Sequence, residues 1–562
     1  MFGKHIDSRF DSLSSPWISA PQIHHPSSDF IGLVDLPVIH TRTIAKPIVA
    51  VRAECLMDTT DIRCVARDRH QWRRNPTHMS ELLSGVAAVR GPSGCAQHPQ
   101  PTLIVRVNTM GPAKIVIIGG GFSGVECARY LERQLRPEEA FIQLVTPDAG
   151  LLYLPLLPQV ASGVLNPRSI SVSLRRVLRR TEVVPGMAIG VHPETRQVVV
   201  QRSAGADCAL DYDHLVLVPG SITRVLDVPG LHEHGFGMKT LAQAMFLRDH
   251  VLQQLDVAAM RGEEDEDRER LHFVTIGAGY AGTETTAVLN KVTQAAARRY
   301  FPALESGMVR WHLVTRGDRI MPELGERLGE QTKQNLAERG IELITGASAK
   351  EVTAHGVQLT NGRFIPSRTV LWTAGAEPSP LAGHLGAATA KGRIVADADL
   401  TVPGLTGVWA CGDAAAVPDL TADAGAVCAP TAQHAMRQGR HLGKNLVAEI
   451  RGGKRVPYRH PDLGMVVDLG GADAVARPLK IGLHGIPAQV VTRGYHLMAL
   501  RTLVARARVA FDWTIHGLSG DDFLRIGYGD YDTHTIDGFE QTNCYLPAEE
   551  VPRALEELCD TD

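Results

Sequence analysis

From Lys114 onward, short runs of β-branched and aliphatic residues alternate with longer stretches that have helical spacing. We predict buried strands at FIQLVTP, HLVLVPGS, LHFVTIGAG, RWHLVTRG and RTVLWTAGA, because each is a brief apolar run that ends in turn-forming residues. Strands that alternate with helices are typical of parallel sheets covered by helices. The pattern therefore predicts an α/β fold for this part of the chain.

Residues 1–110 lack this pattern. Stretches such as IHHPSSDF and RDRHQWRRNPTHM mix His, Arg, Pro and Ser without lasting periodicity, which argues against a packed domain. Met110 stands four residues before the first strand run, where a start codon would suit the fold. We expect either a disordered extension or a sequence upstream of the true start codon that was included by mistake when the start was chosen. We favour the second interpretation slightly.

Two glycine loops dominate the predicted chemistry. KIVIIGGGFSGVECARYL (114–131) and LHFVTIGAGYAGTETTAVL (271–289) each read as a buried strand, a GxGxxG loop and a helix start. The glycines permit a tight turn and a close approach of the backbone to a pyrophosphate, which the helix N-terminus then binds. One such motif is weak evidence, but two in this context predict two dinucleotide sites. The positions expected to contact these ligands are Gly119, Gly121, Phe122, Ser123, Gly124, Gly277, Gly279, Tyr280 and Gly282.

A third motif distinguishes the two sites. TGVWACGDAAAVPD (406–419) is an apolar strand that ends in Gly412 and Asp413, where a carboxylate can hold a sugar hydroxyl. It resembles the second FAD fingerprint of the flavoprotein disulfide reductase superfamily, and LVLVPGS (215–221) resembles the middle motif. The resemblance implies that FAD occupies the first loop and NADH or NADPH the second, so that hydride passes between them. It also implies contacts from Gly220 and Gly375.

Residues 112 to about 520 resemble a type II NADH dehydrogenase, the single-subunit NADH:quinone oxidoreductase. The more specific motifs are LYLPLLPQVASGVLNP (152–167) and PTAQHAMRQG (430–439). The resemblance implies hydride transfer from NADH to FAD and then two electrons to a membrane quinone, without proton pumping. It places Ala432 and Gln433 at the flavin, with Gln438 nearby, and gives both glutamines a role at the quinone.

Glu284 is the other candidate catalytic residue. It stands seven residues after Gly277, where this family commonly carries an acidic residue near the nicotinamide. Burial would raise its pKa and suit it to position the nicotinamide or relay a proton. The alternative is an ordinary first-turn helix residue that the dipole favours. We weigh these interpretations about evenly.

Three positions depart from the family pattern. Thr146 replaces the usual acidic residue after the second strand, although its hydroxyl can still bond a ribose. Arg316 occupies the equivalent place in the second unit and suits the 2′-phosphate of NADPH, or else is a solvated arginine. We favour NADH slightly. Arg437 takes the place of the family's second glutamine, and Gln438 follows it, which leaves the quinone acceptor open.

Composition excludes several other functions. The formal net charge of −3 gives no reason to expect a nucleic-acid partner, and the nine cysteines lack zinc-like or CxxC spacing. We expect no metal site. Cys127 alone follows the first glycine loop, and we interpret it as a buried small hydrophobe rather than half of a redox pair. Cys411 and Cys428 keep a sulfide:quinone reductase as a minor option. A soluble reductase with another acceptor and a flavin-dependent NAD(P)H sensor also remain open.

The domain prediction follows from these motifs. We expect two Rossmann-like domains, the second inserted into the first, followed by a region for membrane association or dimerisation. The boundaries are 1–110 for the extension, 111–235 and 366–455 for the FAD domain, 236–365 for the NAD(P)H domain, and 456–562 for the C-terminal region. The acidic stretch 260–270 is expected to be a solvated connection.

The C-terminal region carries a predicted amphipathic helix near 498–518. Its basic flank and Trp513 suit a helix in the headgroup region of a membrane, and the alternative is a helix that packs on the protein's own core. The resemblance implies membrane attachment and possible homodimer contacts. We expect a cytoplasmic protein, peripheral on the inner face of the plasma membrane. The predicted apolar stripe consists of Leu500, Leu503, Val504, Ala507, Phe511, Ile515 and Leu518.

Overall fold

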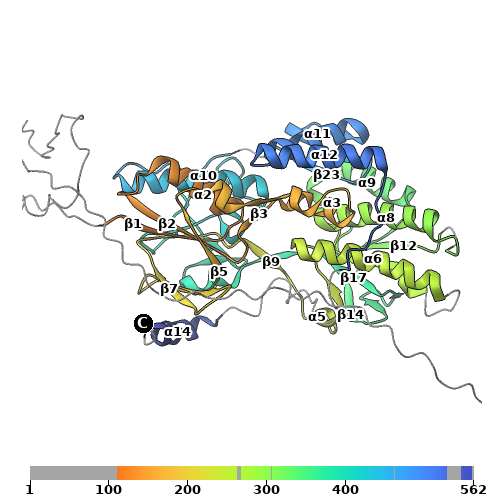
Figure 1. Ribbon diagram of the computed structural model, residues 1–562, viewed down its shortest axis with the longest axis horizontal. Coiled ribbons are helices and arrows are strands. Elements are labelled where there is room, and N and C mark those ends of the chain that lie inside the picture. The colour runs from red at the N-terminus through yellow and green to blue at the C-terminus, as the bar shows by residue number, and fades with distance from the viewer. Residues whose placement is uncertain (1–110, 262–267, 305–306, 461–462, 528–545, 560–562) are drawn as a thin grey trace, which may run out of the picture. The chain divides into compact units, whose positions relative to one another are not determined.

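The computed structural model describes residues 111–261, 268–304, 307–460, 463–527 and 546–559 (Figure 1). The predictions for residues 1–110 and for most of the acidic connection lie outside these ranges. All five strand runs predicted from the apolar pattern are strands, and the α/β prediction is confirmed.

The first sheet has seven strands in the order β21-β8-β1-β2-β5-β6-β7. Strand β1 lies centrally between β8 and β2 and pairs with both in parallel, as expected when helical crossovers connect the strands. Beyond β5, strands β6 and β7 continue the sheet antiparallel. The bounds are β1 Ala113–Ile118, β2 Ala140–Thr146, β5 Glu182–His192, β6 Gln197–Arg202, β7 Cys208–Asp211, β8 His214–Leu217 and β21 Val408–Ala410.

Helices α2 (Phe122–Gln134) and α10 (Ala432–Ile450) pack closely against each other beside this sheet (Figure 1). Small residues permit the approach. A Cβ on Gly439 would lie 2.2 Å from the carbonyl oxygen of Ser123, and the Ser123 hydroxyl donates to the Ala435 carbonyl at 3.0 Å. The two motifs, 312 residues apart in the sequence, are therefore in contact.

The second sheet is wholly parallel, in the order β10-β17-β11-β12-β13. It extends past the expected boundary at residue 365, because β17 pairs with β11, the strand before the second glycine loop. A separate antiparallel sheet holds β14, β15 and β16. The bounds are β10 Gly235–Phe236, β11 His272–Ile276, β12 Arg310–Val314, β13 Ile341–Ile344, β14 Ala349–Thr353, β15 Gly356–Leu359, β16 Phe364–Pro366, β17 Thr369–Trp372, α5 Leu231–His234, α6 Leu241–Arg261, α8 Tyr280–Tyr300 and α9 Glu326–Glu338.

Two short strands mark where the chain leaves the first domain and returns. β9 (Ser221–Thr223) pairs antiparallel with β18 (Ala376–Pro378). Gly220 and Gly375 stand immediately before these strands, and both have positive φ, +80° and +131°. Such φ values favour glycine, so these two residues let the chain turn at the crossing between domains.

Short elements complete the first domain and its borders. They are β3 Gly150–Leu152, α3 Leu157–Ala161, β4 Ser171–Ser173, α4 Leu174–Val177, β19 Thr389–Ala390, β20 Arg393–Val395 and β22 Ala415–Ala416. The described part of the C-terminal region adds a three-stranded antiparallel sheet and three α-helices. These are β23 Val466–Asp468, β24 Ala474–Ala476, β25 Leu483–His484, α11 Gly485–Ala499, α12 Leu503–Ser519 and α14 Val551–Cys559.

The predicted amphipathic helix near 498–518 is wrong at its start, because α11 ends at Ala499, Leu500 is extended and α12 begins at Leu503. The orientation of α12 also differs from part of the prediction. Leu503, Phe511 and Leu518 of the predicted stripe are 78%, 65% and 82% exposed, so the part of the stripe on α12 does not pack on the core, whereas Leu500, before α12, is buried in it. Trp513, expected at a membrane surface, is instead buried and donates through Nε1 to Gln159 Oε1 at 2.6 Å. The indole therefore anchors the helix inward. Among the helices that the structure describes, none is long and apolar enough to span a membrane.

Candidate active site

The first glycine loop has the geometry of a phosphate cradle. Gly119 has φ +114°, and a Cβ there would lie 2.2 Å from the Val218 carbonyl oxygen. A Cβ on Gly124 would lie 1.9 Å from the Gly119 carbonyl oxygen, so only glycine lets α2 begin this close to β1. A Cβ on Gly121 would meet nothing within 4 Å. The loop is thus closed by two glycines and open at the third.

The N-terminus of α2 begins at this open position. Gly121 is the N-cap, and no side chain caps the helix or places an acidic group in its first turn. The first-turn N–H groups and the positive end of the helix dipole are therefore available to an anion. A pyrophosphate over Gly121 fits both the open space and the uncapped helix.

The second loop repeats these features. Gly277 has φ +113°, a Cβ on Gly282 would lie 2.0 Å from the Gly277 carbonyl oxygen, and a Cβ on Gly279 would meet nothing within 4 Å. Helix α8 begins at the N-cap Gly279, again without a side-chain cap. Two equivalent cradles therefore lie in one chain, one after a parallel strand of each large sheet.

Asp413 lies in a short 3-10 turn directly after β21, as the sequence predicted. Its carboxylate accepts from the Ser221 hydroxyl at 3.1 Å, and Lys239 Nζ lies 3.1 Å from the same hydroxyl. The Gly412 N–H donates to Gln438 Oε1 at 2.8 Å. The turn is therefore held from both the interdomain strand β9 and helix α10.

The two predicted glutamines differ in environment. Gln438 is 1% exposed, and its carbonyl supports the Gly412 turn. Gln433, in the first turn of α10, bonds through its amide to the Gly464 carbonyl and the Leu463 N–H. The Arg437 guanidinium donates to the main-chain carbonyl oxygen of Gln433 at 3.0 Å, so the Arg437 charge lies on the same face of α10 as Gln433. Ala432 begins the helix and is partly exposed. The catalytic roles of both glutamines stay predictions.

The two positions that the sequence predicted to bind a ribose or its phosphate follow the ends of strands β2 and β12. Thr146 ends β2, is buried, and donates to the Asp148 carbonyl at 3.0 Å, and its hydroxyl lies against Gly120. Arg316 follows β12, the neighbour of β11, and is exposed. Arg316 can therefore reach a ligand at the second loop. Among the aromatic residues of the loops, Phe122 packs edge-on against Tyr153, and the Tyr280 hydroxyl lies 2.7 Å from Met465 Sδ.

Glu284, on the first turns of α8, faces a second carboxyl residue. Its Oε1 accepts from the backbone N–H of Asp468 at 2.8 Å, although the residues are 184 positions apart. Protein atoms enclose the carboxyl group, while part of the side chain remains accessible. The pKa of Glu284 is raised to about 8, chiefly by burial and to a smaller extent by the Asp468 charge, while the N–H bond from Asp468 opposes the rise. Glu284 is thus suited to carry a proton at neutral pH.

The described thiols near the first loop are not arranged for redox chemistry. Cys127, Cys411 and Cys428 are 0%, 1% and 2% exposed. Burial raises the pKa of Cys411 to about 12 and that of Cys428 to about 11, and it raises the pKa of Cys127 well above its ordinary value. Since the thiolate is the reactive form, all three behave as small apolar residues.

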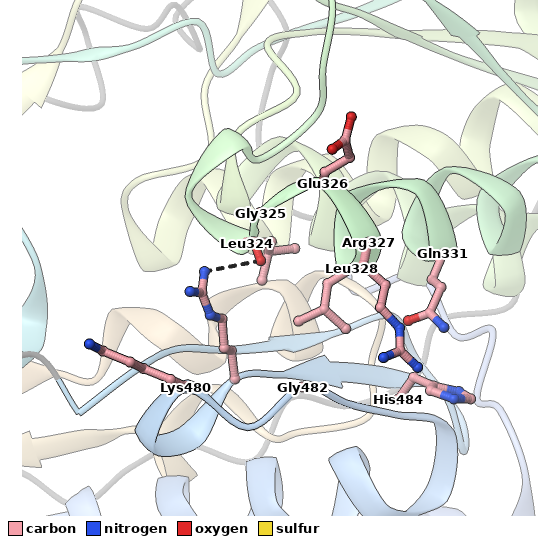
Figure 2. Close-up of a pocket in the computed structure, with 10 residues that line it drawn as sticks. Leu324, Gly325, Glu326, Arg327, Leu328, Gln331, Lys480, Gly482 and His484 are labelled. Carbon is pink, nitrogen blue, oxygen red and sulfur yellow. Dashed lines mark hydrogen bonds between the residues drawn. The ribbon is translucent and has the colours of Figure 1, made fainter.

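A separate cavity of about 310 Å³ lies between the start of α9 and the hairpin before α11 (Figure 2). Arg327, Arg477, Lys480 and His484 line it. Figure 2 shows Glu326 turned away from the other side chains, and Glu326 forms an ion pair with Arg319. The cavity is therefore basic and distinct from both glycine loops.

Comparison with known proteins agrees with this geometry. Residues 113–439, more than half of the chain, match the pyridine nucleotide-disulphide oxidoreductase family. The chain belongs to that family. The match begins at β1 and ends in α10, so it contains both glycine loops and the Asp413 turn.

Similar proteins include type II NADH:quinone oxidoreductases, the class that the motifs predicted. The type II NADH:quinone oxidoreductase Ndh of Mycobacterium tuberculosis is 26% identical over 72% of this chain and 88% of its own. The demethylphylloquinone reductase NdbB of Synechocystis is 28% identical over 73% and 98%. NDH2 of Plasmodium falciparum, solved with NADH, has a TM-score of 0.68 at 17% identity over 73% and 99%, which shows the shared fold. The predicted resemblance to type II NADH dehydrogenases is confirmed.

Sequence reasoning missed the residues that surround Glu284 and Asp413. Asp468 and Lys239 lie in no motif, and they, like Gln159, reach the site from distant elements. Gln159 does lie in the LYLPLLPQVASGVLNP segment that signalled the family. That segment was the available signal, but its pattern did not show which side chain points at the site.

Proposed function

We propose that this protein is a flavin-dependent NADH:quinone oxidoreductase. FAD binds the first glycine loop, with its phosphates over Gly121 and a sugar hydroxyl at Asp413, and NADH binds the second loop over Gly279. The observation that carries the proposal is the pair of open, uncapped glycine cradles at Gly121 and Gly279 in one chain. The family match and the named relatives support it.

Proton balance gives Glu284 its role. When bound, FAD supplies the two-electron chemistry that connects the nicotinamide to the acceptor. Oxidation of NADH releases two electrons and one proton as hydride, whereas reduction of a quinone to a quinol takes two electrons and two protons. One further proton must come from the protein or solvent. Glu284, enclosed and protonated near neutral pH, supplies that proton from its carboxyl group.

We propose that the C-terminal region docks on a membrane, where a quinone would be reached. The exposed apolar residues of α11 and α12 have no cover among the described residues. Leu479 and Ile481, 68% and 63% exposed, flank Lys480 at the basic cavity of Figure 2. Apolar side chains beside cations suit an anionic leaflet, such as the inner face of the plasma membrane. The same apolar face is the candidate surface for a homodimer.

One observation favours a second candidate, a reductase with a non-quinone acceptor. Arg437 stands where the family pattern has glutamine, and it lies beside Gln433. A cation there would suit an anionic or protein acceptor better than a neutral quinone.

The first test is cofactor content and reduction by each nicotinamide. We expect one FAD per full-length chain after purification, and rapid bleaching of the flavin on anaerobic mixing with NADH. Addition of a short-chain quinone restores the colour. A chain that holds flavin but bleaches with neither nicotinamide contradicts the assignment of the second loop.

A further inference from the structure

The carboxylate beside Glu284 is held by an unusually complete set of donors. Asp468 ends β23 and is 7% exposed. Its Oδ2 accepts from Gln159 Nε2 at 2.6 Å and from Gln489 Nε2 at 3.3 Å, and its Oδ1 accepts from the Gly470 N–H at 2.7 Å. Three elements therefore converge on one side chain.

The orientation of Gln159 follows from Trp513. An indole Nε1 can only donate a hydrogen bond, and Trp513 Nε1 lies 2.6 Å from the Gln159 amide. The amide oxygen must therefore face Trp513, and the amide NH₂ must face Asp468. As a result Asp468 is presented with donors, and the pattern favours its ionised form.

The two carboxyl groups thus have unequal surroundings. In the part of the chain that the structure describes, Asp468 accepts three hydrogen bonds from N–H donors, whereas Glu284 accepts one, from the Asp468 backbone. Among the described residues, Arg493 of α11 is the cation that acts on Asp468, and Asp468 is the charged group that acts on Glu284. Burial raises the pKa of both acids, but the donors oppose this at Asp468. A proton shared by the pair therefore resides on Glu284.

We propose that Asp468 is a positioning residue whose charge adds to burial in favouring the protonated form of Glu284, and that Gln159 and Gln489 hold Asp468 ionised for this purpose. The inference rests on the proposed function of Glu284 as proton donor. It also gives the C-terminal helices a part in the chemistry, because Gln489 lies on α11 and Trp513 on α12. Hydrogen bonds thus run from Trp513 of α12 through Gln159 and Asp468 to Glu284.

The direct test is the pH dependence of stability in the full-length chain. Glu284 binds its proton more tightly in the folded state, with a pKa of about 8, than in the unfolded chain. Its contribution to the free energy of unfolding is therefore present below about pH 4.3 and is lost as pH rises through about 8. Glu284→Gln removes this fall.

Asp468→Asn removes the charge beside Glu284 but keeps the backbone N–H that donates to the Glu284 carboxyl group. We expect the midpoint of the fall to move to lower pH by about one unit, the low end of what a close charge produces. The alkaline limb of quinone-dependent NADH oxidation moves in the same direction. Asp473→Asn is the matched control, because Asp473 lies on the same hairpin but pairs with Arg339 at the surface.

Trp513→Phe provides a second variant if Asp468→Asn does not fold. It releases the Gln159 amide and gives a smaller shift in the same direction. If Glu284→Gln abolishes the fall while Asp468→Asn and Trp513→Phe leave its midpoint unchanged, the positioning role is wrong and the proton donor stands. If the pH midpoint of stability shifts as expected but neither the parent chain nor any variant reduces quinone, the positioning role stands and the proposed acceptor is wrong.

Discussion

Single residues determine which parts of the dinucleotide cradles are fixed and which are open to a ligand. Gly119 and Gly124 are required by protein atoms, because a side chain at either would collide with a backbone carbonyl. Gly121 is different, since a Cβ there meets no protein atom within 4 Å. We therefore propose that the missing side chain at Gly121 leaves room for a ligand and is not required by the fold.

The first prediction separates these two requirements. We expect Gly121→Ala to fold normally but to bind FAD about tenfold more weakly or worse, a loss of about 1.4 kcal/mol. Gly124→Ala places its methyl carbon 1.9 Å from the Gly119 carbonyl oxygen, so it costs about 1–3 kcal/mol of stability as well. Flavin titration of the apoprotein and denaturant unfolding measure the two effects. If Gly121→Ala binds flavin as tightly as the parent chain does, FAD does not bind at this loop.

A second prediction concerns Arg316 at the end of β12. A guanidinium that meets a 2′-phosphate forms charge-assisted bonds worth about 1.5–3 kcal/mol, and NADH lacks that phosphate. Arg316→Glu should therefore lower kcat/KM for NADPH by about tenfold to a hundredfold while kcat/KM for NADH changes little. Arg319→Glu is the control, since Arg319 is already paired with Glu326. A matching loss with both nicotinamides would place Arg316 outside the adenosine site.

At the scale of elements, helix α12 shows what periodicity can and cannot establish. The apolar spacing predicted a helix, and it ends within one residue of the expected limit at 518. The pattern left open whether the apolar stripe faces a membrane or the protein's own core, because an amphipathic helix suits either. Buried contacts of Ala505, Val509 and Trp513 select the face that packs inward, and only the fold brings Gln159 to Trp513.

This orientation makes a prediction for membrane binding. Burial of a phenyl side chain in lipid contributes about 1.5–3 kcal/mol, so Phe511→Glu should lower vesicle affinity by about tenfold or more. Co-sedimentation with vesicles that contain anionic phospholipid measures this. Phe364→Glu is the matched control, because Phe364 is 47% exposed on β16, outside the C-terminal region. Vesicle binding that survives Phe511→Glu, with a dimer that dissociates instead, would assign this face to self-association.

At the scale of the whole molecule, the chain leaves the first domain at β9 and returns at β18, and its far end then packs on the first domain again. Val551 and Leu555 of α14 are buried against Ile189 and Val199 of β5 and β6. Gly190 lies beneath this helix, since a Cβ there would lie 2.7 Å from Val551. Nothing in the last forty residues predicted this contact.

That contact should contribute to stability without affecting the chemistry. We expect Leu555→Ala to lower the free energy of unfolding by about 2–5 kcal/mol, because it leaves a cavity against the sheet. Glu556→Ala, exposed on the same helix, should change it little. Denaturant titration of both variants decides, and equal unfolding midpoints would mean that α14 does not pack on the sheet in solution.

The sequence therefore predicted more of the scaffold than of the site. Both glycine loops, the inserted domain and the Asp413 turn have local patterns, because backbone geometry dictates glycine there and strands need apolar runs. Asp468 and Lys239 have no such pattern. Their positions depend on contacts between residues far apart in the chain, and spacing alone does not encode those contacts.

Quinone-dependent oxidation of NADH by the flavin-loaded full-length chain tests the central claim most directly. We expect rapid NADH oxidation that requires both bound flavin and a quinone, with one quinone reduced for each NADH consumed. Flavin that NADH reduces quickly, but that no quinone reoxidises faster than air does, would contradict the account and point to another acceptor beside Arg437.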